Sequence, residues 1–270
     1  MKKILFITLW IFSITAFAND SIMVEMPDEN SQFITEEVIE EITKAEADSA
    51  YIRNEFASAI QMYETLLKEN GESAEVYYNL GNSYYKADQI AKAILNYERA
   101  LLLKPGDNDI RFNLEMAYAK TVDKVNITEQ IFFVSWYKAI VNMMSADAWA
   151  KFAICVFILF LISLVFYIFG KQLILKKIGF GLGILFLILT ILSNVFAFHQ
   201  KDLLVNRTQA IIISPSVTVK STPNERGIDL FILHEGHKVK IKDNSMREWK
   251  EIQLEDGNVG WVPTSILEVI

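Results

Sequence analysis

Residues 74–105 read AEVYYNLGNSYYKADQIAKAILNYERALLLKP, and the second half of this stretch repeats an earlier segment of the chain. The recurring residues are Ala57, Ala59, Ile60, Tyr63, Glu64 and Leu67, which return as Ala91, Ala93, Ile94, Tyr97, Glu98 and Leu101. The members of each pair are 34 positions apart (91 − 57 = 34), and this period is typical of stacked helix pairs. Such units bury their apolar stripes against one another and leave one concave surface free. The sequence therefore predicts an all-α repeat domain that holds another molecule.

Eight residues of this stretch resemble the tetratricopeptide signature: Tyr77, Leu80, Gly81, Tyr84, Ala93, Tyr97, Ala100 and Pro105. We expect Gly81 and Ala93 to lie where the two helices of a unit touch, because a larger side chain would push the helices apart. Pro105 is expected to end the second helix. The copy before this one matches less well, and the copy after it stops after one helix. We predict that the tetratricopeptide helical repeat domain spans residues 35–126.

The tetratricopeptide resemblance also implies a binding surface. One face of the expected helix 74–87 is opposite the packing residues and carries Tyr78, Asn79, Asn82, Tyr85 and Lys86. In tetratricopeptide proteins this face lines the groove, so these five residues are the expected partner-binding residues. They would offer amides, aromatic surface and one cation to an extended peptide. The alternative is that they only follow the ordinary repeat pattern and face water.

The N-terminus has the pattern of an export signal. Lys2 and Lys3 precede an apolar run that ends in the small-residue site Ala16-Phe17-Ala18. We predict a signal peptide over residues 1–18, with cleavage after Ala18 as the expected outcome and an uncleaved anchor as the alternative. Residues 19–34 are polar and acidic, which predicts a disordered leader.

Two further apolar runs predict transmembrane helices. The chain is 52% hydrophobic with a mean hydropathy of +0.24, which exceeds a usual soluble composition. Residues 152–169 and 178–198 contain no charged side chain. At ~1.5 Å of rise per residue, each run can cross a hydrocarbon core of about 30 Å. We predict spanning helices at residues 149–170 and 178–199.

The connection between the spans predicts their orientation. Residues 171–177 include Lys171, Lys176 and Lys177 and no acidic residue. Because positively charged loops stay on the cytoplasmic side, this loop is expected in the cytoplasm. The repeats and the C-terminal segment would then both lie on the periplasmic side of an inner membrane, which agrees with an export signal.

Residues 127–148, between the repeats and the first span, are rich in aromatic side chains. Phe132, Phe133, Trp136 and Tyr137 follow closely in a segment too short to span and interrupted by Lys138. This density next to a membrane helix favours an amphipathic helix lying in the interface. The alternative is that the segment packs against the repeats or against a partner's membrane helix.

Residues 206–270 change to an alternating, β-type pattern, and five short strands punctuated by turn residues predict a small all-β barrel. The segment resembles bacterial SH3-type domains through Trp249, Ile252, Leu254, Gly260, Trp261, Val262, Pro263 and Ile266. In peptide-binding SH3 families, the positions of Trp249 and Pro263 contribute to a groove for proline-rich ligands. The sequence departs from that pattern at two points: Ile266 stands where a tyrosine is usual, and Ala210-Ile211-Ile212 lacks the aromatic cluster of the first strand. The alternative is that Trp249 and Trp261 are barrel core residues.

Charge and motifs exclude several function classes. Residues 19–130 hold 22 acidic and 10 basic side chains, a net charge of −12 (10 − 22), which argues against a nucleic-acid ligand. Cys155 is the single cysteine, and no phosphate-binding loop, serine elbow or paired catalytic carboxylates can be found. We expect no enzyme activity, no cofactor and no metal site.

The complete order of segments resembles the BatE proteins of the Bacteroides aerotolerance operon. That resemblance implies an inner-membrane complex with von Willebrand type A proteins and a MoxR-type ATPase, and a part in stress tolerance. It implies no catalytic residue. The first functional hypothesis is therefore a membrane-anchored scaffold that binds protein partners through the repeat groove. The second is an envelope-sensing or peptidoglycan-binding module that acts through the SH3-like domain, with the repeats as a spacer.

Overall fold

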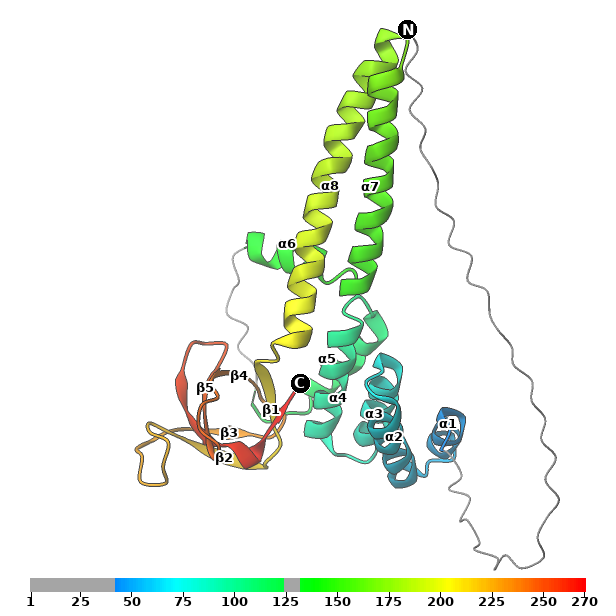
Figure 1. Ribbon diagram of the computed structural model, residues 1–270. Helices are drawn as coiled ribbons and strands as arrows, with labels where there is room; N and C mark the ends of the chain where they lie inside the picture. Colours follow the sequence, from blue (N-terminus) through cyan, green and yellow to red (C-terminus); the bar gives the residue numbers. More distant parts are fainter. Residues whose placement is uncertain (1–41, 124–131) are drawn as a thin grey trace, which may run out of the picture. The chain divides into compact units, whose positions relative to one another are not determined.

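The computed structural model describes residues 42–123 and 132–270 (Figure 1). The predicted signal peptide and acidic leader lie outside these residues, as do the first residues of the predicted repeat domain. All of these described residues belong to one compact unit.

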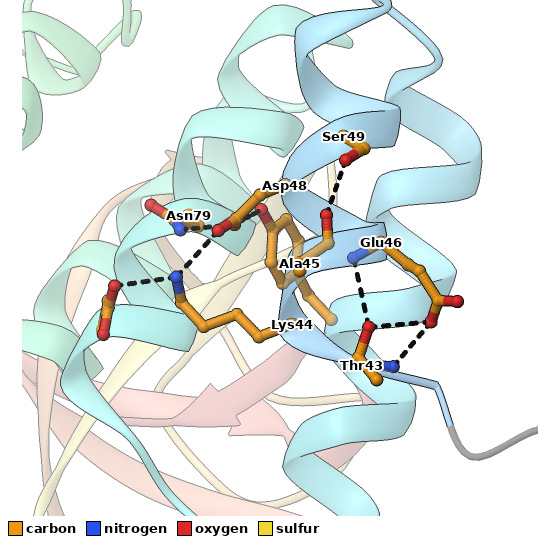
Figure 2. Close-up of polar contacts among 9 residues, drawn as sticks. Thr43, Lys44, Ala45, Glu46, Asp48, Ser49 and Asn79 are labelled. Carbon is orange, nitrogen blue, oxygen red and sulfur yellow. Dashed lines mark hydrogen bonds and ion pairs between the residues drawn. The ribbon is translucent and has the colours of Figure 1, made fainter.

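Five helices form the first part of this unit, and each packs against the next along the chain. They are α1 (Lys44–Ile52), α2 (Phe56–Asn70), α3 (Ala74–Lys86), α4 (Ile90–Leu103) and α5 (Asn108–Tyr118). Thr43 begins α1 with a capping box, in which its hydroxyl accepts from the Glu46 N–H and the Glu46 carboxylate accepts from the Thr43 N–H (Figure 2). The stack therefore contains two helix pairs and a single following helix.

The turns inside the two pairs repeat with the sequence. Asn54, between α1 and α2, and Asp88, between α3 and α4, have φ of 62° and 58° and are 34 positions apart (88 − 54 = 34). Asn and Asp are the side chains that adopt this left-handed conformation most readily. The end of each pair differs, because α2 stops at Gly71 with φ 82° whereas α4 stops before Pro105.

Gly81 brings α3 and α4 into close contact, as the sequence predicts. A Cβ atom at Gly81 would lie 2.7 Å from both Cδ1 and Cε1 of Tyr97. Tyr97 and the neighbouring Ala93 are themselves almost fully buried, so the ring has little room to move. At the present spacing of the two helices, a methyl group at position 81 would overlap the Tyr97 ring.

Two long helices follow the short helix α6 (Phe132–Val141). They are α7 (Ala146–Phe169) and α8 (Leu173–Val205), and each is long and apolar enough to cross a membrane. Most of the apolar side chains of α7 and α8 lie on the surface of the protein. The two helices pack where Gly179 of α8 meets α7, since a Cβ there would lie 2.9 Å from the Ser163 carbonyl oxygen. The connection is shorter than the sequence predicts, because Lys176 and Lys177 already belong to α8.

Residues 206–270, all of which the structure describes, form one antiparallel sheet. Its strands are β1 (Gln209–Ile212), β2 (Ser216–Lys220), β3 (Asp229–His234), β4 (Lys238–Asp243), β5 (Trp249–Gln253), β6 (Val259–Pro263) and β7 (Leu267–Val269). Their order is β3-β2-β6-β5-β4-β1-β7, with β3 and β7 at the edges. The sequence predicts five strands closing into a barrel, whereas the structure has seven strands and the sheet is not closed. Strand β1 coincides with the first strand expected from sequence, whereas β7 has three residues and is too short to give a clear alternation.

Strand β1 belongs to both hydrophobic cores. Ala210 and Ile212 pack in the core of the sheet, while Ile211 between them packs in the core of the helical stack. Successive side chains of a strand point to opposite faces, so one strand can serve two cores. Lys238 of β4 adds an ion pair to Glu98 of α4, with 2.7 Å between Nζ and Oε2. The sheet is therefore packed directly on the repeat helices.

We predict that Gly81→Ala destabilises the helical stack by about 1–3 kcal/mol, because the methyl group would overlap the immobile Tyr97 ring. Thermal unfolding of the full chain in detergent, followed by circular dichroism, measures the change. Gly181→Ala is the matched control, since nothing lies within 4 Å of a Cβ at that helical position. Equal melting temperatures for Gly81→Ala and the unaltered chain would contradict the tight contact.

Candidate functional site

A groove runs along one side of the helical stack. It encloses a cavity of about 320 Å³ and takes side chains from α1, α3, α4 and α5. The lining residues are Tyr51, Tyr78, Asn82, Tyr85, Lys86, Tyr97, Phe112, Asn113 and Met116. Four of the residues predicted from sequence, Tyr78, Asn82, Tyr85 and Lys86, are therefore brought together here.

A hydrogen-bond network closes the floor of the groove. The Tyr97 hydroxyl donates to Asn82 Oδ1 at 2.8 Å, and Asn113 Nδ2 donates to the same oxygen at 2.9 Å. Asn113 Nδ2 also lies 2.9 Å from the Tyr78 hydroxyl. The burial of Tyr97 raises the pKa of its phenol, so the hydroxyl remains a neutral donor. The carbonyl of Asn82 is thus engaged within the chain, and the network ties α3, α4 and α5 together.

Asn79, the fifth predicted residue, does not line the cavity. It donates to an acceptor on α1 in the same way as Asn113 donates to Asn82 on α3. Its Nδ2 donates to Asp48 Oδ1 at 3.0 Å, and the Tyr63 hydroxyl donates to the same oxygen at 2.5 Å (Figure 2). Lys44 Nζ lies 2.8 Å from the other carboxylate oxygen. Burial alone would raise the pKa of Asp48, but the hydrogen bonds from Lys44, Tyr63 and Asn79 lower it. Asn79 therefore joins α3 to α1 and α2.

These two networks are copies separated by one repeat. The acceptors Asp48 and Asn82, the donors Tyr63 and Tyr97, and the donors Asn79 and Asn113 are each 34 positions apart (82 − 48, 97 − 63 and 113 − 79). A second pair of bonds follows the same rule: Tyr84 donates to Glu64, and Tyr118 donates to Glu98. The polar contacts obey the period of the sequence as closely as the apolar ones.

The rim of the groove is open and apolar, and two lysines lie at one end of it, of which Lys120 pairs with Asp88 at 3.6 Å. Phe112 and Met116 are 62% and 47% exposed, and Lys86 is exposed beside them. The Lys120 ammonium lies 4.2 Å from the centre of the Tyr85 ring, within range of a cation–π contact. The arrangement offers aromatic and thioether surface, with cations at one end, to a ligand lying along the helices.

Sequence reasoning missed the contributions of α5 and α1 to this groove. Phe112, Asn113 and Met116 lie 34 positions after Tyr78, Asn79 and Asn82, and Tyr51 lies 34 positions before Tyr85. The same period of 34 therefore predicts these residues when it is applied to the groove positions as well as to the packing positions.

Trp249 and Pro263, the two residues predicted from the SH3 resemblance, lie on the sheet and do not line the groove. They are register partners on the adjacent strands β5 and β6, and both are half-buried. The sheet places them side by side, so an exposed part of each is available on one surface.

Comparison with known protein families matches residues 74–107 to the tetratricopeptide repeat. The matched segment covers α3 and α4 with the turn that joins them, and so includes Tyr78, Asn82, Tyr85, Lys86 and Tyr97 of the groove. A comparison with curated proteins gave no match.

We predict that Asn82→Leu destabilises the chain by about 1–3 kcal/mol, because the buried Tyr97 hydroxyl would lose its acceptor and the Asn113 amide would lose one of its two partners. Asn82→Asp is the matched control, since Asp48 accepts the same two kinds of donor in the preceding unit. Denaturant titration of the full chain in detergent compares the two variants. If Asn82→Leu were as stable as Asn82→Asp, the network would have no structural role.

Proposed function

We propose that this chain is a non-catalytic, membrane-anchored scaffold that binds protein partners through the groove of its tetratricopeptide helices. The family match to residues 74–107 supports protein–protein interaction, since stacked helix pairs present a concave surface for a partner. The two long apolar helices support anchoring in a membrane.

The observation that carries the proposal is the exposure of the groove's apolar rim. Phe112 and Met116 leave large parts of their side chains uncovered above a floor whose polar groups bond to one another. Aromatic and methionine side chains are enriched in protein interfaces, where each buries a large apolar area. Lys86, exposed at the rim, favours a segment that carries a carboxylate near its apolar residues.

For localisation, we propose an inner membrane with the groove and the sheet on the periplasmic side. Lys171 lies in the turn between α7 and α8, and Lys176 and Lys177 lie at the start of α8. The positive-inside rule assigns this end of the helix pair to the cytoplasm. The repeat helices precede the start of α7 in the chain, and the sheet follows the end of α8. Both therefore lie toward the ends of α7 and α8 that are away from this turn. The resemblance in segment order to BatE proteins extends the proposal to von Willebrand type A proteins and a MoxR-type ATPase as partners in stress tolerance. That extension rests on the resemblance alone.

The alternative function, binding of peptidoglycan through an SH3-like domain, draws on the pairing of Trp249 with Pro263 across β5 and β6. An aromatic ring beside a proline is the kind of surface that SH3-type domains use. Under this alternative, Trp249→Ala lowers the amount of full chain that sediments with purified sacculi, and changes in the helical groove leave it unaltered.

We predict that Phe112→Ser combined with Lys86→Glu lowers the recovery of crosslinked membrane partners about tenfold, the effect of losing ~1.4 kcal/mol of binding energy. Both side chains are exposed, so the fold is expected to persist. The measurement is quantitative mass spectrometry of proteins that co-purify with the full chain after crosslinking in membranes.

Ile52→Ser is the control, because Ile52 is 76% exposed at the end of α1 and does not line the groove. Unchanged recovery with the double variant, or an equal loss with Ile52→Ser, would refute the assignment of the groove.

A further inference from the structure

The short helix α6 exposes more aromatic surface than a soluble helix usually does. Phe132, Phe133 and Trp136 are 75%, 73% and 61% exposed. Among residues 42–123 and 132–270, no element covers these three neighbouring aromatic side chains, and such a patch marks an interaction surface. Neither the helical groove nor the sheet makes use of them.

The aromatic residues of α6 gather on one side of the helix. At about 100° per residue, Phe132, Phe133, Trp136, Tyr137 and Ile140 fall within an arc of roughly 140°. Ser135 and Lys138 fall on the opposite side. The helix is therefore amphipathic, with an apolar face made almost wholly of rings.

Contacts with the two long helices fix α6 at one end. The Tyr137 ring lies 5.9 Å from that of Phe196 and 5.7 Å from that of His199, both edge-on. The Val141 carbonyl oxygen accepts from Trp149 Nε1 at 3.0 Å and from Gln200 Nε2 at 2.9 Å. Both bonds are buried, so they hold the end of α6 firmly against α7 and α8.

These contacts also set the level of α6 along the spanning helices. The uncharged apolar run of α8 ends at Phe198 and is followed by His199-Gln200-Lys201-Asp202. The residues that hold α6, Phe196 to Gln200, lie at this change from apolar to polar. Figure 1 shows α6 lying across α8 and not along it. A helix held crosswise at that level lies at the boundary between hydrocarbon and water.

We propose that α6 lies in the interfacial layer of the bilayer that contains α7 and α8, with Phe132, Phe133 and Trp136 inserted at the boundary between headgroups and acyl chains. The inference rests on the membrane anchoring proposed above. The bilayer is the occupant because the exposed rings continue the apolar surface of the spanning helices to which α6 is bonded. Aromatic side chains favour this layer, and amphipathic helices lie in it. The chain thus has a second contact with the membrane, which restrains rotation of the hairpin.

Site-directed spin labelling of the full chain in lipid nanodiscs tests this assignment. In a Cys155→Ala background, nitroxides are attached at Phe133→Cys and Trp136→Cys on the apolar face and at Ser135→Cys on the opposite face. Ile158→Cys within α7 and Phe112→Cys in the groove are the lipid and water references. Collision with oxygen, which concentrates in lipid, is compared with collision with a water-soluble nickel chelate.

We expect positions 133 and 136 to favour oxygen, as position 158 does, and position 135 to favour the nickel chelate, as position 112 does. If position 158 favours oxygen while 133 and 136 behave like 112, the interfacial placement is refuted and the membrane anchor stands. If 133 and 136 are shielded from both reagents, another protein covers the face and the placement is likewise refuted. If position 158 itself favours nickel, the membrane anchor fails, and the inference fails with it.

Discussion

The helical stack depends on a hydrogen bond from a buried tyrosine to an acceptor on the preceding helix. Tyr63 donates to Asp48 and Tyr97 donates to Asn82, and in each case an asparagine of the next unit donates to the same oxygen. One acceptor therefore fixes both the packing within a unit and the packing between units. Because buried polar groups without a partner are costly, the arrangement also excludes alternative registers of the helices.

The groove is a consequence of this arrangement and of the close contact at Gly81. The Tyr97 ring packs directly against Gly81, and its hydroxyl reaches the floor of the groove at Asn82. With the floor closed by internal bonds, the surface left for a partner is the apolar and cationic rim. The sheet packs against the helices through Ile211 of β1 and contributes no residue to the groove. The helices can therefore bind a partner while the sheet remains packed against them.

Much of this was predictable because the chain repeats itself. The period of 34 predicts the helix pairs, and the absence of a side chain at Gly81 predicts the close contact with α4. The sequence places Asn79 among the groove residues, whereas the structure shows that its amide is bonded to Asp48, a contact that no local pattern predicts. Phe112 and Met116 were missed because the period of 34 was applied to the packing positions of the third copy and not to its groove positions. Strand β7 was missed because its three residues are too few to establish an alternating pattern.

The most direct test of the account is photocrosslinking in intact cells from a benzoylphenylalanine placed at Met116, in the groove, and separately at Ile52, outside it. The account predicts that one discrete membrane protein is captured from position 116 and is absent from position 52. Crosslinks that are the same at both positions, or that come only from position 52, would show that the groove is not the binding surface.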